Sequence, residues 1–588
     1  MIIGFDFGTT NSLISFVMGE GTINLFDSEG LPFPSVVRYE GQSVIAGREA
    51  RLALEEVGLG VYGNTVRSPK VLLGNEVVSV GGVERSPIDI VADVIRHVRS
   101  ESEQNPRAKG NVPFDRAVVT IPVTMNGPKR AALREAFAQN GISVVQFVHE
   151  PLAALYGYLR TAPDRENLLR KLLKRYVLVV DWGGGTLDLT LCLLNNGSIL
   201  QLRNGGSDQV GGDQFDEVIR HEVVKRFSLE SGIMATDQPT KEARQKLRED
   251  SEKLKIALSQ RPSATIYRGG YFPESGTNLE YELTRRELDE IIRPLITEGV
   301  RQIDALLDSA SISPAQVSMC LVAGGMAAMP SIRSRLHELF GPERVVIPED
   351  SATLIAQGAA WMAHDEQTLR LAKDIELEMA RGSRLAVLQA GTLMPTDGEI
   401  RRELVHLYCT DPSDGKAKFP IVTTRDLKSQ PQAGDPRTSL GLLSVLVDKT
   451  APPLVERLEL ELEIDDNLIL NVTAKSSQRA NTDKASFYDL EFGIALPGIE
   501  NLGPVSVIDA DSGPFPCGLV VRTNVVDKND PKLIPGDVLY GHNPNAFSRR
   551  PGPNQATEEQ LIEHLYYQPC ALCRSPWGDP SCRCASGG

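Results

Sequence analysis

The sequence predicts an α/β fold over about residues 1–365, followed by an all-β domain and a tail of different composition. Short apolar strands alternate with helical patterns in the first part, which is typical of α/β proteins. Over about residues 376–500, apolar and polar residues alternate one by one, which indicates strands with one buried face. After residue 500 the chain is rich in proline and glycine and contains four closely spaced cysteines.

The α/β region contains strand-like runs at Ala117–Ile121, Tyr176–Val180 and Met319–Ala323. They consist mainly of apolar and β-branched residues, which favour extended structure. Helices are expected at Thr240–Ser259 and Thr284–Ser309, where leucine and isoleucine recur at helical spacing among glutamate, lysine and arginine. We expect this region to form the first domain.

The β region begins after a short charged stretch at 366–377, which we expect to be an interdomain linker. Leu454–Ile464 and Leu468–Ala474 alternate apolar and polar residues around an Asp-Asp-Asn turn, which is a hairpin signal. Leu440–Val447 and Ser486–Phe492 are expected to be further strands. The predicted segments are therefore 1–365, 366–377, 378–500 and 501–588.

Composition and charge narrow the function classes. The 588 residues include 41% hydrophobic and 24% charged residues, values that exclude wholesale disorder. Asp and Glu (77) outnumber Lys and Arg (62), and the net charge of −15 argues against sequence-independent nucleic-acid binding. No apolar run is long enough for a transmembrane helix, and the N-terminal residues lack the basic start of a signal peptide. We expect a cytoplasmic protein that binds neither nucleic acid nor membrane.

The cysteines fall into two groups. Cys192, Cys320 and Cys409 lie in apolar surroundings and are expected to be buried, inert thiols. The tail cysteines are Cys570, Cys573, Cys582 and Cys584. Four thiolates could bind zinc tetrahedrally and order a small segment, although a single residue separates the second pair. Free thiols in the tail are the alternative.

The first motif with chemical content covers Ile3–Ser12. A strand ends in Asp6, a Gly-Thr-Thr-Asn turn follows, and a second strand covers Leu13–Val17. Glycine lets the backbone approach an anion, and successive N–H groups and hydroxyls can cradle phosphate oxygens without adding charge. Asp6 can hold a metal ion through water, because Mg²⁺ gives up its waters reluctantly.

The second motif, Val179–Leu189, repeats this pattern. A strand ends in Asp181, a Gly-Gly-Gly-Thr turn follows, and Asp188 lies near the start of the next strand. Two such hairpins facing each other would clamp one phosphate chain and one metal ion between two lobes. Two ordinary β-turns are the alternative interpretation.

A third motif, Leu321–Pro330, places Gly324 and Gly325 between a strand and a helix. This suits close backbone approach to a flat ligand such as a nucleoside. Upstream, a helical stretch carries polar residues at i, i+3 and i+7, namely Glu252, Lys255 and Ser259. A solvated helix face is the simpler interpretation of that pattern.

With these motifs, the chain resembles the Hsp70 chaperone family of the actin/hexokinase/Hsp70 ATPase superfamily. The segments that carry the resemblance are the two phosphate motifs, Asp6–Ser12 and Asp181–Asp188, and further Val118–Val123, His149–Ala154 and Val210–Asp216. The resemblance implies a two-lobed, actin-like ATPase domain with ATP or ADP and Mg²⁺ as cofactors. It also implies a β-sandwich domain that binds extended apolar peptides.

Individual roles follow from the same resemblance. Lys70 is expected to stabilise the γ-phosphate and the attacking water, and Glu150 to orient that water. Asp6 and Asp181 are expected to hold Mg²⁺ through its waters. The residues expected to act in catalysis are Lys70, Glu150, Asp181, Thr186 and Asp188. The other implied nucleotide contacts are Gly8, Thr9, Thr10, Asn11, Gly183, Gly184, Gly185, Gly211, Gly212, Glu252, Lys255, Ser259, Gly324 and Gly325. The expected reaction is slow hydrolysis of ATP to ADP and phosphate.

The chain also departs from the family pattern. Ile256 and Ala328 stand where members often have arginine, so a stacking contact with adenine is lost and affinity is expected to fall by about 1 kcal/mol per contact. The stretch Leu369–Leu377 keeps an aspartate and some leucines of the family linker but adds charge. The long lid helices of the family have no counterpart after residue 500 other than Thr557–Tyr567. Fast peptide release is therefore expected.

The sequence thus predicts an Hsp70-like chaperone that binds and hydrolyses ATP to control its binding of unfolded polypeptide segments, with cochaperones as further partners. The alternative is a nucleotide-dependent assembly switch with one dedicated protein partner, which the altered linker and the cysteine-rich tail favour. A small-metabolite kinase of the same superfamily would leave residues 376–497 unexplained.

Overall fold

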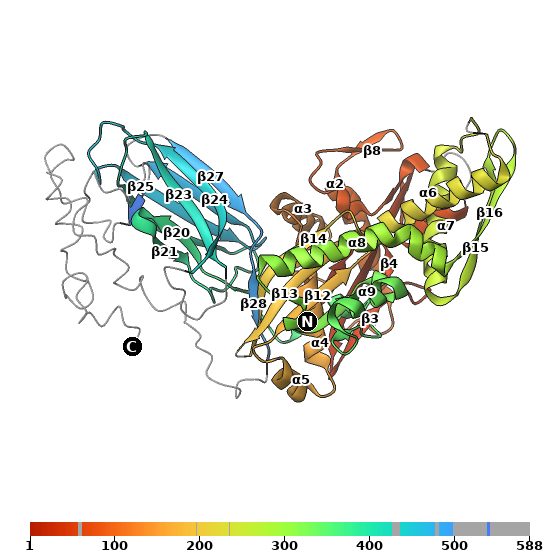
Figure 1. Cartoon of the computed structure of the whole chain (residues 1–588), viewed down its shortest axis with the longest axis horizontal. Coiled ribbons are helices and arrows are strands. Elements are labelled where there is room, and N and C mark those ends of the chain that lie inside the picture. The colour runs from red at the N-terminus through yellow and green to blue at the C-terminus, as the bar shows by residue number, and fades with distance from the viewer. Residues whose placement is uncertain are drawn as a thin grey trace. The chain divides into compact units, whose positions relative to one another are not determined.

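The computed structural model describes residues 1–56, 62–195, 197–234, 236–425, 435–476, 481–497 and 538–540. These residues form two compact units, both drawn in Figure 1. The first unit comprises Met1–Thr368 and the residues that follow from Ile494, described to residue 497. The second unit comprises Leu369–Gly493 and the described residues 538–540.

Two large sheets dominate the described part of the first unit, and we call the half around each of them a lobe. The first lobe comprises the elements from β1 to α5 together with α10. Its main sheet has the strand order β11-β10-β1-β2-β3, with β4 paired to β2. These strands are β1 (Ile3–Phe7), β2 (Asn11–Met18), β3 (Gly21–Leu25), β4 (Phe33–Pro34), β10 (Arg116–Ile121) and β11 (Ser143–His149). Because β1 runs parallel to β10 and antiparallel to β2, the turn after Asp6 lies at the carboxyl edge of the sheet.

Smaller strands and α-helices complete the described part of the first lobe. The strands are β5 (Val36–Glu40), β6 (Ser43–Ala46) and β7 (Thr65–Arg67) in one sheet, and the hairpin β8 (Val78–Val80) and β9 (Val83–Arg85). The helices are α1 (Arg48–Glu56), α2 (Pro87–Gln104), α3 (Gly127–Ala138), α4 (Glu150–Thr161), α5 (Arg165–Leu172) and α10 (Leu354–His364).

Helices α4 and α10 cross at a pair of glycines. A Cβ atom on Gly358 would lie 1.8 Å from the carbonyl oxygen of Ala153, and one on Gly157 would lie 2.9 Å from the Cα of Gly358. Only residues without a side chain allow the two backbones to approach this closely. The crossing therefore fixes the position of α4, whose first residue is Glu150.

The second lobe comprises the elements from β12 to β18. Its main sheet includes the strand order β18-β17-β12-β13-β14. The strands of the lobe are β12 (Tyr176–Trp182), β13 (Leu187–Asn195), β14 (Ser198–Ser207), β17 (Val317–Ala323) and β18 (Val345–Val346), with the hairpin β15 (Ser263–Phe272) and β16 (Thr277–Thr284). The helices are α6 (Gly212–Ser231), α7 (Lys241–Gln260), α8 (Arg285–Ser309) and α9 (Pro330–Phe340). Helix α8 runs along one face of this sheet (Figure 1).

The structure confirms the elements predicted in the α/β region. The three predicted strands are β10, β12 and β17, and the two predicted helices are α7 and α8. Both predicted helices begin one residue early, at Thr240 and Thr284, because these residues are N-caps. Each threonine has an extended backbone while its side-chain oxygen accepts a hydrogen bond from the first turn.

The described residues of the second unit form two antiparallel sheets, with the strand orders β21-β20-β23-β24 and β27-β26-β25-β22-β29. The strands are β20 (Ile375–Met379), β21 (Ser383–Leu388), β22 (Ile400–Cys409), β23 (Lys416–Thr424), β24 (Arg437–Leu446), β25 (Arg457–Asp465), β26 (Leu470–Ser476), β27 (Thr482–Phe487) and β29 (Val538–Tyr540). Every second residue of β25 is buried, from Leu458 to Ile464. The predicted hairpin of β25 and β26 is confirmed.

The predicted strand Ser486–Phe492 is wrong. Strand β27 ends at Phe487, and a separate strand, β28 (Phe492–Ala495), begins at Phe492. The reason is that Phe487 pairs with Leu470, the first residue of the partner strand β26, so no partner remains for the residues that follow. The stretch predicted as a linker contains β19 (Arg370–Leu371), which pairs with β28, and the start of β20.

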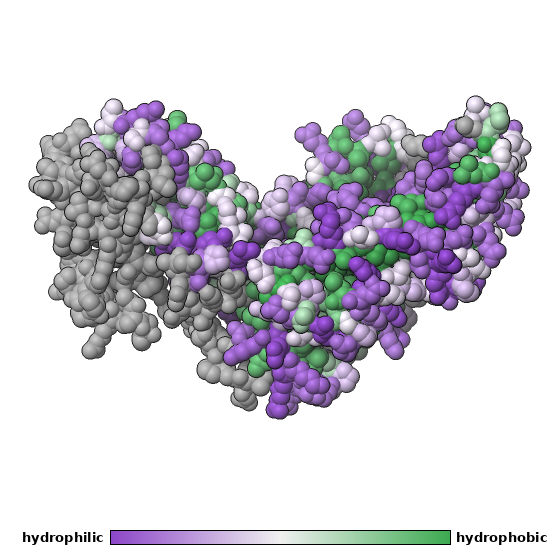
Figure 2. Space-filling model, viewed as in Figure 1, coloured by the Kyte–Doolittle hydropathy of each residue, from purple (hydrophilic) through white to green (hydrophobic). Residues whose placement is uncertain are grey.

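Surface and burial follow the expected pattern. Figure 2 shows a mainly hydrophilic surface over α6, α7 and α8, as expected for helices that bury one face. The thiols of Cys192, Cys320 and Cys409 are buried, as predicted, and burial raises the pKa of Cys409 to about 12. Among the helices of the described residues, none combines the length and the apolar composition that a membrane span requires. The predicted helix Thr557–Tyr567 and the four tail cysteines lie outside the described residues.

Candidate functional site

The two glycine-rich turns predicted to face each other lie in direct contact in the first unit. A Cβ atom on Gly184 would lie 2.3 Å from Oγ1 of Thr10, and one on Gly185 would lie 2.7 Å from Cγ2 of Thr9. At distances this short, a side chain at either glycine would force the facing threonine to shift. The threonines of the first turn therefore pack against the bare backbone of the second turn.

A cleft of about 280 Å³ opens at these turns, between the two lobes. The predicted site residues that line it are Asp6, Gly8, Thr9, Thr10, Asn11, Glu150, Asp181, Gly183, Gly184, Gly185, Thr186, Gly212, Glu252, Lys255, Gly324 and Gly325. Lys70, Asp188, Gly211 and Ser259 do not line it. The structure thus brings most of the predicted residues to one cleft.

Three aspartates from the two hairpins surround the phosphate turns. Burial and the nearby Glu150 raise the pKa of Asp6 to about 6 and that of Asp188 to about 7. They raise the pKa of Asp181 well above its usual value. Asp6 accepts a hydrogen bond of 2.7 Å from Thr120, and Asp188 accepts one of 2.9 Å from the backbone N–H of Val123.

Two polar atoms of the cleft fit a phosphate and a cation. Within the described part of the chain, Oδ1 of Asp181 and Oγ1 of Thr10 are buried without a hydrogen-bond partner. Buried polar groups are normally paired, so an unpaired group indicates a missing ligand or water. A hydroxyl donor beside bare glycine backbone suits a phosphate oxygen, and the clustered carboxylates suit a divalent cation.

Lys70 and Glu150 form a buried ion pair behind the phosphate turns. The Nζ atom of Lys70 donates to Oε1 of Glu150 over 3.0 Å, and only 4% of the lysine side chain and 8% of the glutamate side chain are exposed. Lys70 belongs to a short 3-10 turn, Pro69–Leu72, and Glu150 begins α4. Glu150 lines the cleft, whereas Lys70 lies beyond it.

The segment Gly211-Gly212 supports the second phosphate turn. The N–H of Gly212 donates to the carbonyl of Gly183 over 3.1 Å, and the N–H of Asp213 donates to that of Gly184 over 2.7 Å. A Cβ atom on Gly211 would lie 2.4 Å from the backbone of Gly185. This segment thus holds the turn through its backbone.

Of the predicted adenosine contacts on α7, two line the cleft and one does not. The Nζ atom of Lys255 lies 2.7 Å from Asp216 and donates to the carbonyl of Gly212 over 3.1 Å. Ser259 donates to the carbonyl of Lys255, one turn earlier, and stays outside the cleft. Ile256 lines the cleft with a side chain that is 53% exposed, and Ala328 does not line it.

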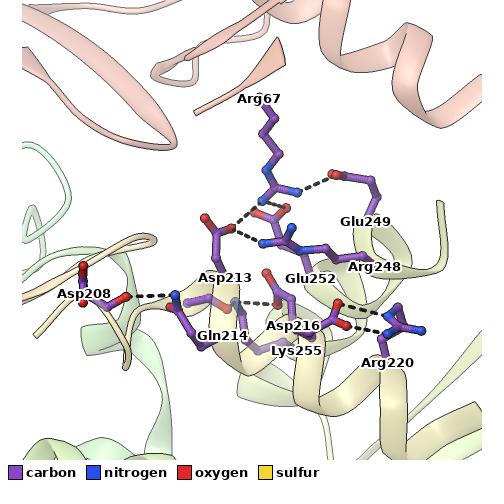
Figure 3. A network of polar contacts seen from close by, with 12 residues as sticks. Arg67, Asp208, Asp213, Gln214, Asp216, Arg220, Arg248, Glu249, Glu252 and Lys255 are labelled. Carbon is purple, nitrogen blue, oxygen red and sulfur yellow. Dashed lines mark hydrogen bonds and ion pairs between the residues drawn. The ribbon is translucent and has the colours of Figure 1, made fainter. Parts of the chain in front are cut away.

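A cluster of charged residues beside the cleft escaped the sequence analysis. Figure 3 shows Arg67 pointing toward Asp213, Glu249 and Glu252. Arg67 and Asp213 line the cleft together with the predicted Glu252. No local pattern indicates these contacts, because Arg67 is separated from Glu249 by 182 positions in the chain.

His149, which precedes Glu150, gives a pH-dependent prediction. Burial and the charge of Arg130 lower its pKa to about 3, against a hydrogen bond with Gln201 that raises it. The unfolded chain takes up a proton near pH 6.5, and the folded chain does so only near pH 3. Stability is therefore lost as the pH falls through this window, by up to about 1.4 kcal/mol per pH unit.

We expect the free energy of unfolding of the wild type to drop by about 1 kcal/mol more than that of His149→Asn when the pH falls from about 7 to about 5.5. Urea denaturation at both pH values measures this difference. Parallel losses in the two proteins would contradict the prediction.

The comparisons with known proteins agree with this geometry. Residues 73–490 match the family model described as Hsp70 protein. The chain belongs to the Hsp70 family. This Hsp70 is 28% identical over 495 residues to "Chaperone protein DnaK" of Mycoplasma mycoides subsp. mycoides SC, covering 82% of this chain and 78% of that protein. The protein of the same name from Thermosipho melanesiensis is 27% identical over 486 residues, covering 81% and 78%. That from Cenarchaeum symbiosum is 27% identical over 493 residues, covering 81% and 71%.

This Hsp70 is a divergent, Hsp70-like chaperone, and its first unit has the actin-like ATPase fold. Members of the family are ATPases that use nucleotide and Mg²⁺. Across the described ranges, no three His, Cys, Asp or Glu side chains are grouped to ligate one metal ion. The predicted zinc site lies outside those ranges and gains no support.

Proposed function

We propose that this Hsp70 binds Mg²⁺ and ATP in the cleft and hydrolyses ATP slowly to ADP and phosphate. The observation that carries the proposal is the contact between the two phosphate turns, where the unpaired hydroxyl of Thr10 meets the bare backbone of Gly184. Asp6 and Asp181 would hold the cation through its waters, which agrees with the absence of a direct ligand set among the described residues.

The residues around the two phosphate turns would have different roles in hydrolysis. When bound, the magnesium ion neutralises charge on the phosphates and leaves the γ-phosphorus open to attack. Thr9, Thr10 and Thr186 would hold the phosphate chain. Glu150 would orient the attacking water, and its ion pair with Lys70 fixes the carboxylate in one position.

Asp188 does not line the cleft. Its Oδ1 atom accepts a hydrogen bond from Val123, so the carboxyl group is held rigidly beneath the second turn. We assign to it a supporting role near the water and metal shell. Glu252, Lys255, Gly324 and Gly325 would contact the nucleoside, and the placement of Ser259 speaks against a contact of its own.

Phosphate release from ATP by the full chain tests this function. We expect slow turnover that requires Mg²⁺ and disappears when the metal is chelated. Tight nucleotide binding without turnover would show that the cleft binds ATP but does not hydrolyse it. A chain that neither binds nor hydrolyses ATP would overturn the proposal.

We further propose that the second unit is a β-sandwich that binds unfolded or extended polypeptide segments, under the control of the nucleotide. Its two antiparallel sheets and the one-sided burial of strands such as β25 support a sandwich. The proposed domains are 1–365, 366–377, 378–500 and 501–588. An assembly switch with one dedicated partner is not favoured, because the relatives carry the name of a chaperone. Cochaperones as partners and a cytoplasmic location remain predictions.

Peptide release gives a test of the second unit. We expect a fluorescent apolar peptide to dissociate fast, because the loss of a lid would act mostly on the off-rate. Deletion of the residues after 540, which keeps β29 in its sheet, should change the dissociation rate by less than about threefold. Fluorescence anisotropy after addition of unlabelled peptide measures the rate. A lifetime that shortens strongly on deletion would contradict the expectation that no lid covers the peptide.

A further inference from the structure

One arginine of the first lobe contacts three carboxylates of the second lobe. Arg67 is the last residue of β7. Its Nη1 atom lies 2.5 Å from Glu249, and its Nη2 atom lies 3.0 Å from Asp213 and 3.2 Å from Glu252. Glu249 and Glu252 belong to α7, and Asp213 belongs to α6. Figure 3 shows Arg67 entering this group from a segment separate from both helices.

The contacts of Arg67 are largely shielded from water. The exposed fractions of the side chains are 13% for Arg67, 3% for Glu249 and 12% for Glu252. Burial opposes the charge of Arg67, but the neighbouring carboxylates, with Glu249 first, raise its pKa above the usual range. Separating these groups would leave buried charges without partners, which is costly.

Arg67 is also one of the few positively charged residues that line the cleft. The described residues that line the cleft include six carboxyl side chains but only two cations, Arg67 and Lys255. Lys255 comes from the second lobe and is held by Asp216 and by the carbonyl of Gly212. Arg67 is therefore the lining cation, within the described part of the chain, that reaches across from the first lobe.

The partners of Arg67 connect it to both ends of the cleft. Asp213 accepts from Arg67 with its side chain and donates its backbone N–H to the carbonyl of Gly184 in the second phosphate turn. Glu252 accepts from Arg67 and lies on the same helix wall as Ile256, which lines the cleft. Arg67 thus connects the phosphate side to the helix wall. Arg51 of α1, also in the first lobe, contacts Glu252 as well, at 3.0 Å, but it does not line the cleft and does not contact Asp213.

On the basis of the ATP site proposed above, we propose that Arg67 is a positioning residue for the bound nucleotide. By holding Asp213 and Glu252 from the opposite lobe, it keeps the cleft closed around the ligand and slows nucleotide release. The lobes have to separate to let a nucleotide out, and this separation breaks all three contacts of Arg67. Entry into an already open cleft does not require that step, so the effect belongs to the off-rate.

Stopped-flow measurements with a fluorescent ADP analogue on the full chain test this role. In Arg67→Gln, we expect the dissociation rate to rise at least about tenfold while the association rate changes by less than about threefold. Arg67→Lys keeps the positive charge but loses the forked donors of the guanidinium. Its dissociation rate should lie between those of the wild type and Arg67→Gln.

Arg248→Gln is the matched control. Arg248 approaches Asp213 to 3.5 Å, but it belongs to α7 and so does not join the lobes. We expect its nucleotide release to stay within about twofold of the wild type. Glu249→Gln is a second variant, for the case that Arg67→Gln fails to fold, because Glu249 contacts Arg67 without lining the cleft. It should also speed release.

The outcomes separate this role from the ATP site itself. Dissociation rates equal to that of the wild type in both Arg67→Gln and Glu249→Gln would overturn the role of Arg67 and leave the ATP site standing. Equal acceleration in Arg248→Gln would also overturn it, since the effect would then come from the charge cluster in general. A wild-type chain that does not bind the analogue would remove the ATP site and this role together.

Discussion

Replacing Lys70 with alanine is expected to lower the rate of ATP hydrolysis at least about 100-fold, the typical effect of removing one electrostatic contact from a transition state. Lys70 is buried against Glu150 at 3.0 Å, and Glu150 lines the cleft. Without the lysine, the carboxylate loses its orientation and stands unpaired beside Asp6 and Asp181, whose charges already repel it.

Single-turnover hydrolysis with a preformed ATP complex separates this chemical effect from nucleotide binding. Because loss of one partner of a buried ion pair also destabilises the fold, thermal unfolding should accompany the assay. Arg160→Ala provides the control, since Arg160 lies in the last turn of the same helix and pairs with Asp365 at 2.9 Å, far along α4 from Glu150. It should lose stability but keep the hydrolysis rate. Hydrolysis by Lys70→Ala within a few-fold of the wild type would contradict the role of the lysine.

Replacing Gly184 with alanine is expected to weaken binding of Mg²⁺-nucleotide about 5- to 150-fold, the range that corresponds to about 1–3 kcal/mol of overpacking. The new Cβ atom would lie 2.3 Å from Oγ1 of Thr10 and 3.1 Å from its Cβ atom. The two phosphate turns would have to move apart, or Thr10 would have to rotate away from the phosphate position.

The neighbouring glycine gives the comparison for this test. A Cβ atom on Gly183 would meet only the carbonyl of Thr186, at 3.4 Å, which is an ordinary contact. Gly183→Ala should therefore weaken nucleotide binding clearly less than Gly184→Ala. Isothermal titration with ADP and Mg²⁺ measures both. Equal losses in the two variants would show that the contact between the turns is not what Gly184 provides.

Most of the phosphate site could be predicted because the residues that form it lie close together in short segments of the sequence. An aspartate at the end of a strand, followed by glycine and threonine, specifies both the turn and the groups that it presents. The pairing Asp6–Leu13 in one hairpin and Asp181–Asp188 in the other follows from that local pattern. The recurrence of the pattern also predicted that two turns share one ligand, and the structure places them in contact.

The family resemblance predicted less well which residues of α7 reach the cleft. Glu252, Lys255 and Ser259 share one face of the helix, because positions separated by three and seven residues lie on the same side. Glu252 and Ser259 are nevertheless about 10 Å apart along the axis, at 1.5 Å per residue. Where the cleft wall ends along the helix depends on how the lobes pack, and Ser259 instead donates to the carbonyl of Lys255.

By itself, the sequence of this Hsp70 determined the α/β and β regions and the two phosphate hairpins, because these depend on local periodicity and turn chemistry. The ion pair of Lys70 with Glu150 came from the structure. Only the tertiary structure decided the contacts of Arg67 with Asp213, Glu249 and Glu252, which are separated from it by 146, 182 and 185 positions. Charged residues carry no periodic signal for their partners. An ion pair between two lobes therefore exists only once their packing has brought its members within reach and removed the water around them.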